Sequence, residues 1–334
     1  MALINTPFLV DRLIGFQKTV RDVVIASRNK QALYEVSHTT AADTIYKIDT
    51  EVEPILEDFC RELGKAVPLV LIAEGLEDEH GNEANKTFPE GTKEEDCKIR
   101  LIVDPIDGTR GIMYDKRPAW ALAGIAPNKG ANTRLRDIEV AVMSELPTSK
   151  MGYADVLWAV KGQGAKAQRV NLIDGQGTPL PIGGSKADTL KHGFATVSNF
   201  FPGTKVLASE LMEHIVRHSI GAADVTKAMI FDDQYISTGG QFYELINGHD
   251  RFNADLRPVF YAMQNQPEGL CCHPYDCATL LIAEEAGVII TDENGHPLDG
   301  PLDCTTGLSW IGYANPTLRE KIEPLVKQFI AEKL

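Results

Sequence analysis

The segment Ile102-Val-Asp-Pro-Ile-Asp-Gly-Thr109 constrains this chain more than any other part of the sequence. The apolar run from Ile99 to Val103 predicts a buried strand. This strand ends in two carboxylates, Asp104 and Asp107, and Pro105 between them fixes its own φ and lacks an N–H. Like charges held close together repel each other, but they suit a divalent cation, which binds hard oxygen ligands. The segment therefore predicts a metal site at the end of a strand.

An ordinary turn is the alternative for this segment, because Asp-Pro and Asp-Gly are common turn dipeptides. Two other segments have a similar form. The apolar run from Leu69 to Ala73 predicts a strand that ends at Glu74, and Asp276 opens a predicted helix. Each has a plain interpretation, since Glu74 alone is typical of a surface acid and Asp is a favoured helix N-cap. The occurrence of all three segments in one chain indicates a cluster of acids.

Charge and cysteine content exclude several classes of function. The chain has 334 residues, with 33 basic and 47 acidic side chains and a net charge of −14. This balance argues against a nucleic-acid partner or an anionic membrane, and an anionic substrate would need metal ions to reverse the local field. The six cysteines form no C-x-x-C pair, which indicates reduced thiols in a cytoplasmic protein. We expect no signal peptide and no membrane span.

Apolar periodicity gives the order of the elements. Helical spacing predicts helices over 8–27, 49–63, 205–218, 240–247, 276–286 and 316–333. Short apolar runs predict strands over 69–73, 99–103, 120–126, 138–143, 156–161 and 288–291. The strands over 120–126, 138–143 and 156–161 are expected to form an antiparallel sheet. Thr50 and Glu53 predict a capping box at the start of the second helix, with Pro54 in its first turn. The polar segment 76–97 predicts a mobile loop.

These elements predict an α/β (α+β) fold with two lobes. We expect lobe 1–190 to carry most of the acids, and lobe 191–334 to carry Asp276 and the substrate contacts.

The order of the acidic segments resembles the inositol monophosphatase-like superfamily of magnesium-dependent, often lithium-sensitive phosphatases. The central motif Asp104-Pro-Ile-Asp-Gly-Thr109 is complete, and Ala73-Glu74-Gly75 stands where the family has Gly-Glu-Glu. Tyr275-Asp276 and Glu285-Ala-Gly287 stand where the family has Trp-Asp and Glu-Ala-Gly-Gly. Weaker likenesses are Asp43 to Asp49 followed by Glu53, and the hairpin segment Gly162-Gln-Gly-Ala165. The resemblance spans roughly residues 10–330 and implies a layered αβαβα sandwich of the sugar-phosphatase type.

The resemblance also implies roles for individual residues. Two or three Mg²⁺ ions would be held by Glu74, Asp104, the carbonyl of Ile106, Asp107 and Asp276. The catalytic residues would be Asp49, Glu74 and Thr109, with Asp49 and Thr109 orienting the attacking water. Substrate contacts would come from Gly108, Thr109, Arg110, Ser237 and Thr238. Oxygen donors without His or Cys also favour Mg²⁺ over Zn²⁺ on chemical grounds.

The implied substrate is a small phosphorylated polyol, with inositol monophosphate as the first expectation. Fructose 1,6-bisphosphate and 3′-phosphoadenosine-5′-phosphate are the alternatives. The family's habit of dimerisation makes a homodimer a further expectation.

The sequence departs from the family pattern in three places. Gly75 replaces the second Glu, which affects the weakest metal site, and the nearby Glu77 is not assigned to it. Tyr275 replaces Trp in an aromatic wall. Arg110 follows the central motif where the family often has a small residue. Its guanidinium can recognise a second anionic group on the substrate or pair with a nearby acid, and both interpretations stay open. For Ser237 and Thr238 the alternative role is an ordinary helix cap.

Three rival interpretations are weaker. A haloacid-dehalogenase-type phosphatase needs Asp-x-Asp-Gly-Thr, whereas Asp104 and Asp107 are three positions apart. His214 and His218 have a zinc-like spacing on a helix, but two ligands do not make a zinc site. A non-catalytic phospholigand-binding protein would be expected to have lost the metal-binding acids.

Overall fold

The computed structural model of this protein describes residues 5–27, 36–39, 44–74, 76, 85–221, 224 and 226–333. The helices are α1 (Thr6–Ser27), α2 (Lys47–Ala66), α3 (Thr109–Met113), α4 (Lys205–Ile220), α5 (Thr238–Ile246), α6 (Arg257–Met263), α7 (Leu280–Glu285) and α8 (Pro316–Lys333). The strands are β1 (Val36–Thr39), β2 (Thr44–Tyr46), β3 (Leu69–Ala73), β4 (Lys86–Phe88), β5 (Ile99–Asp107), β6 (Ala119–Pro127), β7 (Val140–Leu146), β8 (Tyr153–Val160), β9 (Ala165–Asn171), β10 (Gly177–Pro179), β11 (Phe194–Val197), β12 (Asp250–Asp255), β13 (Ile289–Thr291) and β14 (Trp310–Tyr313).

Two mixed sheets form the framework. The larger sheet has eight strands in the order β10-β9-β8-β7-β6-β5-β3-β4, in which β3 and β5 are parallel. The smaller sheet has four strands in the order β11-β12-β14-β13, in which β11 and β12 are parallel. A separate pair joins β1 and β2. The α/β prediction is confirmed, and β6, β7 and β8 form the predicted antiparallel ladder.

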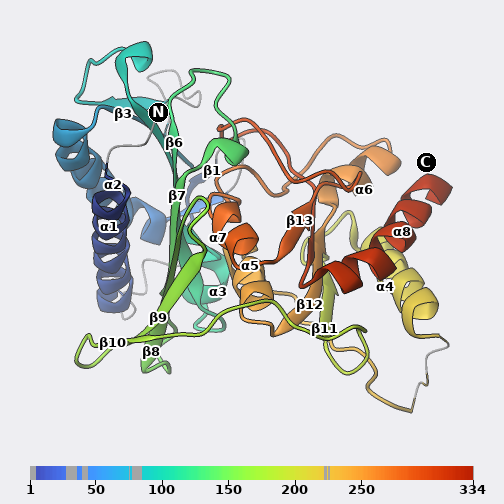
Figure 1. The fold of residues 1–334 in the computed structure, drawn as a ribbon. Coiled ribbons are helices and arrows are strands. Elements are labelled where there is room, and N and C mark those ends of the chain that lie inside the picture. Colours follow the sequence, from blue (N-terminus) through green and yellow to red (C-terminus); the bar gives the residue numbers. More distant parts are fainter. Residues whose placement is uncertain are drawn as a thin grey trace.

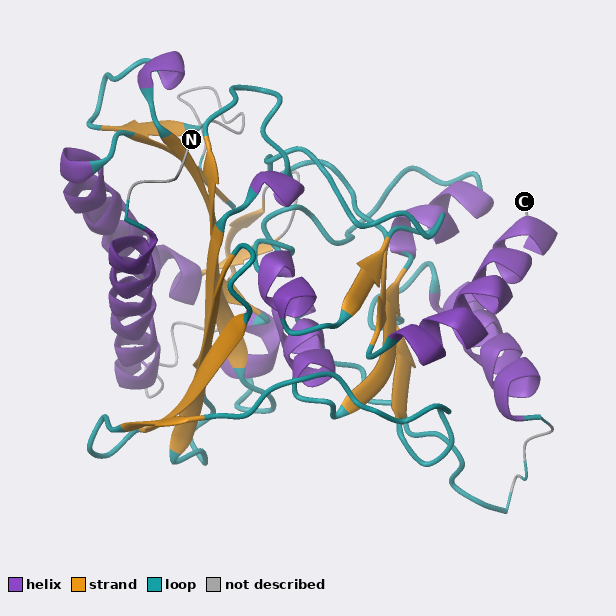
Figure 2. Ribbon diagram, in the orientation of Figure 1, coloured by secondary structure: helices purple, strands orange, loops and turns teal. Residues whose placement is uncertain are grey.

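The helices and sheets alternate in layers (Figures 1 and 2). Helices α1 and α2 cover one face of the larger sheet, and α5 and α7 lie between the two sheets. Helices α4 and α8 cover the far face of the smaller sheet. The predicted layered αβαβα sandwich is thus confirmed.

Strand β5 is buried on both faces, and this explains its continuous apolar sequence. Ile99, Leu101 and Val103 point into the core beneath α1 and α2. Ile102 points the other way, into the core shared by the inner helices and the smaller sheet. Because fully burying one such side chain is worth roughly 1.5–3 kcal/mol, the position of this strand is strongly determined. The acids at its end are held equally firmly.

Helix α7 is tied to the larger sheet through its last residue. The carboxylate of Glu285 accepts hydrogen bonds from the backbone N–H groups of Gly162 and Gly164, each at 2.6 Å. These two glycines form the turn between β8 and β9. The Gly162-Gln-Gly-Ala165 segment is therefore a hairpin that anchors α7.

Three element predictions were wrong in detail. Helix α2 begins at Lys47 because Ile48 extends its buried stripe, so Thr50, Glu53 and Pro54 lie inside the helix rather than at its start. Strand β4 lies within the segment predicted as a loop, where it pairs with β3. Helix α7 begins at Leu280 rather than at Asp276, because tight turns with i to i−3 hydrogen bonds occupy 273–278.

Two remaining predictions concern the chain as a whole. The change from the larger to the smaller sheet falls between β10 and β11. A lobe boundary near residue 190 is compatible with this order and stays a prediction. Within the described part of the chain, no helix is long and apolar enough to cross a membrane.

Candidate functional site

The end of β5 brings two carboxylates to one side of the sheet. Residues i and i+3 of a regular strand point to opposite faces. Here the pairing of β5 with β6 is irregular between Asp104 and Asp107, and an irregularity of this kind re-aims side chains. Asp104 and Asp107 are 5% and 6% exposed, and both line one pocket. The backbone N–H of Ile106 donates to Asp104 Oδ1 at 2.9 Å, which fixes the first carboxylate.

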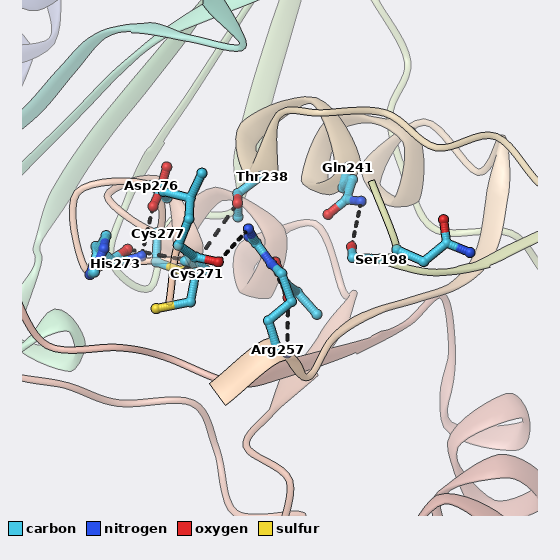
Figure 3. A network of polar contacts seen from close by, with 12 residues as sticks. Ser198, Thr238, Gln241, Arg257, Cys271, His273, Asp276 and Cys277 are labelled. Carbon is cyan, nitrogen blue, oxygen red and sulfur yellow. Dashed lines mark hydrogen bonds and ion pairs between the residues drawn. The ribbon is translucent and has the colours of Figure 1, made fainter. Parts of the chain in front are cut away.

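Asp276 completes a cluster of three acids. Oxygen atoms of Asp104, Asp107 and Asp276 lie within 4.8 Å of one another. The N–H of His273 donates to Asp276 Oδ2 at 2.6 Å and orients this side chain within its turn, as Figure 3 shows. Asp276 is therefore held by a turn rather than serving as the cap of a long helix.

The electrostatics of this cluster call for a cation. Burial, together with the negative charges of Asp107, Glu74 and Asp276, raises the pKa of Asp104 well above its usual value. Burial and the charge of Asp276 raise the pKa of Asp107 to about 8. Without a counter-ion the folded protein thus penalises the charged forms of these carboxyl groups. Because the donors are carboxylate oxygens, the cluster suits a hard divalent cation.

The start of α5 holds Asp107 in place. The N–H of Gly239 and the hydroxyl of Ser237 donate to Asp107 Oδ2 at 2.6 and 2.9 Å. Ser237 also caps α5, because its Oγ accepts the N–H of Gly240 at 2.8 Å. Position 239 requires glycine, since a Cβ there would lie 2.9 Å from Asp107 Oδ2 and 2.6 Å from a methyl of Leu122. The cap predicted as the alternative role of Ser237 is thus present and also supports a candidate metal ligand.

Glu74 follows β3, next to the cluster. The hydroxyl of Tyr275 lies 3.3 Å from Glu74 Oε1 and donates a hydrogen bond to it. Glu74 lines the same pocket as Asp104 and Asp107, and its charge contributes to the raised pKa of Asp104. Asp43, Gly75 and Glu77, which the sequence analysis names near the site, lie outside the described residues.

The predicted water-orienting pair is in contact. Thr109 Oγ1 lies 3.1 Å from Asp49 Oδ1 and 2.7 Å from the carbonyl oxygen of Ile106, so its hydroxyl can donate to either oxygen. Thr109 begins the short helix α3, and Gly108 before it has φ +94°, a left-handed conformation that favours glycine. The contact joins the start of α2 to the end of β5.

Basic and aromatic side chains form the opposite wall of the pocket. The guanidinium of Arg110 lies 5.3 Å from the ring centre of Phe201. Arg257 lies 5.0 Å from the ring centre of Phe200, and its Nε donates to Asp255 Oδ1 at 2.8 Å. The sequence analysis did not assign Arg257 to the site. The Asp-x-Arg spacing could have indicated the ion pair, but its place in the pocket depends on distant packing.

Thr238 also lines the pocket, where its hydroxyl contacts Cys272 Sγ at 3.7 Å. All the residues named from the sequence as catalytic, metal-binding or substrate-binding, except Asp49, line this pocket; Asp49 lines an adjacent one with Glu74, Asp104 and Ile106.

The histidine pair lies elsewhere. The rings of His214 and His218 lie 4.3 Å apart between their centres and are tilted by 38°, in a groove between α4 and α8. Among the residues that the structure describes, Asp104, Asp107 and Asp276 form the one cluster of His, Cys, Asp or Glu side chains with metal-like spacing.

Comparison with known proteins gives one distant relative and many similar folds. No family model matches the chain. A fructose-1,6-bisphosphatase/inositol-1-monophosphatase of Methanothermobacter thermautotrophicus is 23% identical over 227 residues, which covers 67% of this chain and 66% of that protein. The matched region is thus just under two thirds of the length of the relative.

Solved structures match over nearly the whole chain. Leishmania major fructose-1,6-bisphosphatase has a TM-score of 0.66 at 15% identity, covering 95% of this chain and 93% of that one. A Thermotoga maritima IMPase has a TM-score of 0.59 at 17% identity, covering 97% of this chain and 100% of that one. The chain therefore has the fold of the inositol monophosphatase and fructose-1,6-bisphosphatase superfamily, and the resemblance seen in the sequence is confirmed at the level of the fold.

Proposed function

We propose that this protein is a Mg²⁺-dependent phosphatase that hydrolyses phosphate monoesters of small phosphorylated polyols, with inositol monophosphate as the first candidate substrate. The observation that carries the proposal is the buried cluster of Asp104, Asp107 and Asp276, with oxygens within 4.8 Å, at the bottom of a pocket. The shared fold supports it, because similar structures include enzymes named for these activities.

The donor set fits magnesium. Glu74, Asp104, the carbonyl of Ile106, Asp107 and Asp276 would hold two or three Mg²⁺ ions, since each of these groups offers a hard oxygen ligand. When bound, such ions neutralise phosphate charge, lower the pKa of a bound water and stabilise the leaving oxygen.

The chain's own residues would position the reactants. When Thr109 donates its hydroxyl hydrogen to Asp49, a lone pair of the Thr109 oxygen is left to accept a hydrogen bond from the attacking water and so to orient it. Ser237 and Gly239 both bind Asp107 Oδ2, which leaves Asp107 Oδ1 as the oxygen that would bind a metal ion. Gly108, Thr109, Arg110, Ser237 and Thr238 would surround the substrate.

A doubly anionic substrate is the second candidate. Arg110 and Arg257 lie on one wall of the pocket beside Phe200 and Phe201, where a guanidinium can bind a second phosphate. Fructose 1,6-bisphosphate and 3′-phosphoadenosine-5′-phosphate are the substrates whose second phosphate this wall would contact, and they remain the alternatives to inositol monophosphate.

Release of inorganic phosphate from these three substrates tests the proposal, with Mg²⁺ or with EDTA. We expect hydrolysis with Mg²⁺ only. We also expect Asp104→Asn to lower kcat/KM by about a thousandfold, which is about 4 kcal/mol of transition-state stabilisation. Wild-type activity in this variant would overturn the assignment, and binding of these compounds without turnover would favour a phospholigand-binding protein.

Three finer parts of the proposal concern lithium, oligomeric state and compartment. Lithium added to the Mg²⁺ reaction tests lithium sensitivity, and sedimentation tests the proposed homodimer. The six free, buried cysteines favour a reducing compartment, so we place the protein in the cytoplasm.

A further inference from the structure

A pair of thiols lies directly behind the acid cluster. The Sγ atoms of Cys272 and Cys277 are 3.5 Å apart, and the two residues are 1% and 0% exposed. A disulfide bond has a length of about 2.05 Å, so the two sulfurs need to approach by only about 1.5 Å to form one. No movement of one sheet relative to the other is required, because both thiols belong to the same short turn.

This turn is the one that holds Asp276. The Asp276 carboxylate accepts the N–H of His273, and the N–H of Cys277 donates to the carbonyl of Pro274 at 3.1 Å. Figure 3 shows His273, Asp276 and Cys277 together beside Thr238. Shortening the distance between the two sulfurs therefore strains the segment that orients a candidate metal ligand. Since Mg²⁺ demands near-ideal octahedral geometry at about 2.0–2.1 Å, a small displacement of this carboxylate weakens binding.

The pocket gives a small oxidant a route to the pair. Thr238 lines the pocket, and its hydroxyl contacts Cys272 Sγ at 3.7 Å. Cys271, the neighbour of Cys272 in the chain, also lines the pocket. Cys272 is thus in contact with a residue that lines the space in which we place the substrate.

We propose that Cys272 and Cys277 form an oxidative modification site, whose closure to a disulfide switches off the metal centre. Hydrogen peroxide, or another peroxide, oxidises the Cys272 thiol to a sulfenic acid and is reduced to water. The Cys277 sulfur then attacks the Cys272 sulfur, the S–S bond forms, and the sulfenic hydroxyl leaves with the Cys277 proton as a second water. The two sulfurs together supply the two electrons that reduce the peroxide. The effect on turnover rests on the proposed phosphatase function, whereas the disulfide itself does not.

Peroxide treatment of the full-length protein tests this site. Mass spectrometry of peptides would identify the linked thiols, and phosphate release and Mg²⁺-dependent stabilisation against urea would be followed in the same samples. We expect a Cys272–Cys277 link to form as activity falls at least tenfold, and dithiothreitol to restore both.

Variants separate this site from general oxidation. Cys272→Ser and Cys277→Ser should each form no link and keep their own untreated activity after peroxide. Cys60→Ser, which changes a buried thiol on α2, should respond like the wild type. If Cys272→Ser does not fold, Cys277→Ser gives the same comparison.

Two results would overturn the proposal. One is the absence of the Cys272–Cys277 link under conditions that oxidise other thiols of the protein. The other is inactivation of the Cys277→Ser variant at the wild-type rate. If no phosphate ester is hydrolysed at all, the phosphatase proposal fails, but the link and the loss of Mg²⁺-dependent stabilisation still test the modification site.

Discussion

Replacing Asp104 by Asn should stabilise the metal-free protein while removing its response to Mg²⁺. Asp104 is 5% exposed and shares its site with Asp107 and Asp276. In the wild type the N–H of Ile106 donates to Asp104 Oδ1 at 2.9 Å. Asn has nearly the same shape as Asp, and its Oδ1 can accept the same hydrogen bond. The substitution therefore changes the charge of the cluster far more than its packing.

The expected magnitude follows from the spacing of the acids. Two unit charges 4.8 Å apart, the upper limit of the distances between the ligand oxygens of the cluster, repel by about 3.5 kcal/mol at an effective dielectric constant of about 20. Because burial raises the pKa of Asp104 and of Asp107, only part of this repulsion is present at neutral pH. We expect Asp104→Asn to raise the free energy of unfolding in EDTA by about 1–3 kcal/mol.

Magnesium should reverse the order of stability. At a hundredfold excess over its Kd, Mg²⁺ stabilises the wild type by about 2.7 kcal/mol, and the variant should gain less than about 1 kcal/mol because it lacks a ligand. Urea unfolding followed by circular dichroism, in EDTA and in MgCl₂, measures both values, with the exposed Glu320→Gln on α8 as control. A variant that is less stable than the wild type in EDTA, or that gains as much from Mg²⁺, would refute the reasoning.

Three further predictions concern pH, packing and the α7 anchor. Burial and Asp276 raise the pKa of Asp107 to about 8, so between about pH 4 and pH 8 the native state binds more protons than the unfolded state. The free energy of unfolding in EDTA should therefore fall as pH rises through this range, and it should fall more steeply than in Asp107→Asn. Urea unfolding at a series of pH values measures this dependence, and an equal dependence on pH in both proteins would contradict the prediction. Gly239→Ala places a Cβ 2.9 Å from Asp107 Oδ2, so it should lower the free energy of unfolding by about 1–3 kcal/mol and remove most of the phosphatase activity. Gly15→Ala, with nothing within 4 Å of its Cβ, is the control and should lower neither the free energy of unfolding in urea nor the rate of phosphate release. Glu285→Ala removes two charged hydrogen bonds and should lower the free energy of unfolding in urea by about 2–3 kcal/mol. The control Glu320→Ala should change this free energy by less than about 0.5 kcal/mol. A similar loss of stability in both variants would argue against the anchoring role of Glu285.

The central acids could be predicted because they follow from a local pattern, whereas the order of the layers came from the family resemblance. A strand buried on both faces has a continuous apolar sequence, so β5 and its terminal acids Asp104 and Asp107 stand out in the sequence. The parallel pairing of β3 with β5 then brings Glu74 to the same edge. Asp276 joins them in the prediction only through the occurrence of three acidic segments in one chain and through the resemblance, because no local pattern indicates which strand end a distant turn approaches.

Other features depend on packing between distant segments. The residues before Leu280 have helical apolar spacing, yet hydrogen bonds to His273 and Pro274 hold them in turns. Arg257 lines the pocket because Phe200 and Phe201, from a segment far upstream, pack against its guanidinium. The 3.5 Å contact between the two buried thiols likewise depends on the shape of a turn that the sequence predicts as helix.

The hydrogen bonds of Glu285 to the β8–β9 hairpin have a consequence for synthesis of the protein. They fasten the segment that follows Asp276 to the sheet that carries Asp104 and Asp107. An incomplete chain that ends before α5 would contain the larger sheet with α1 and α2, but neither Asp276 nor α5 and α7 on the other face of that sheet. Such a fragment could not assemble the cluster, so loading of metal would report that translation has passed Asp276, in the last fifth of the chain.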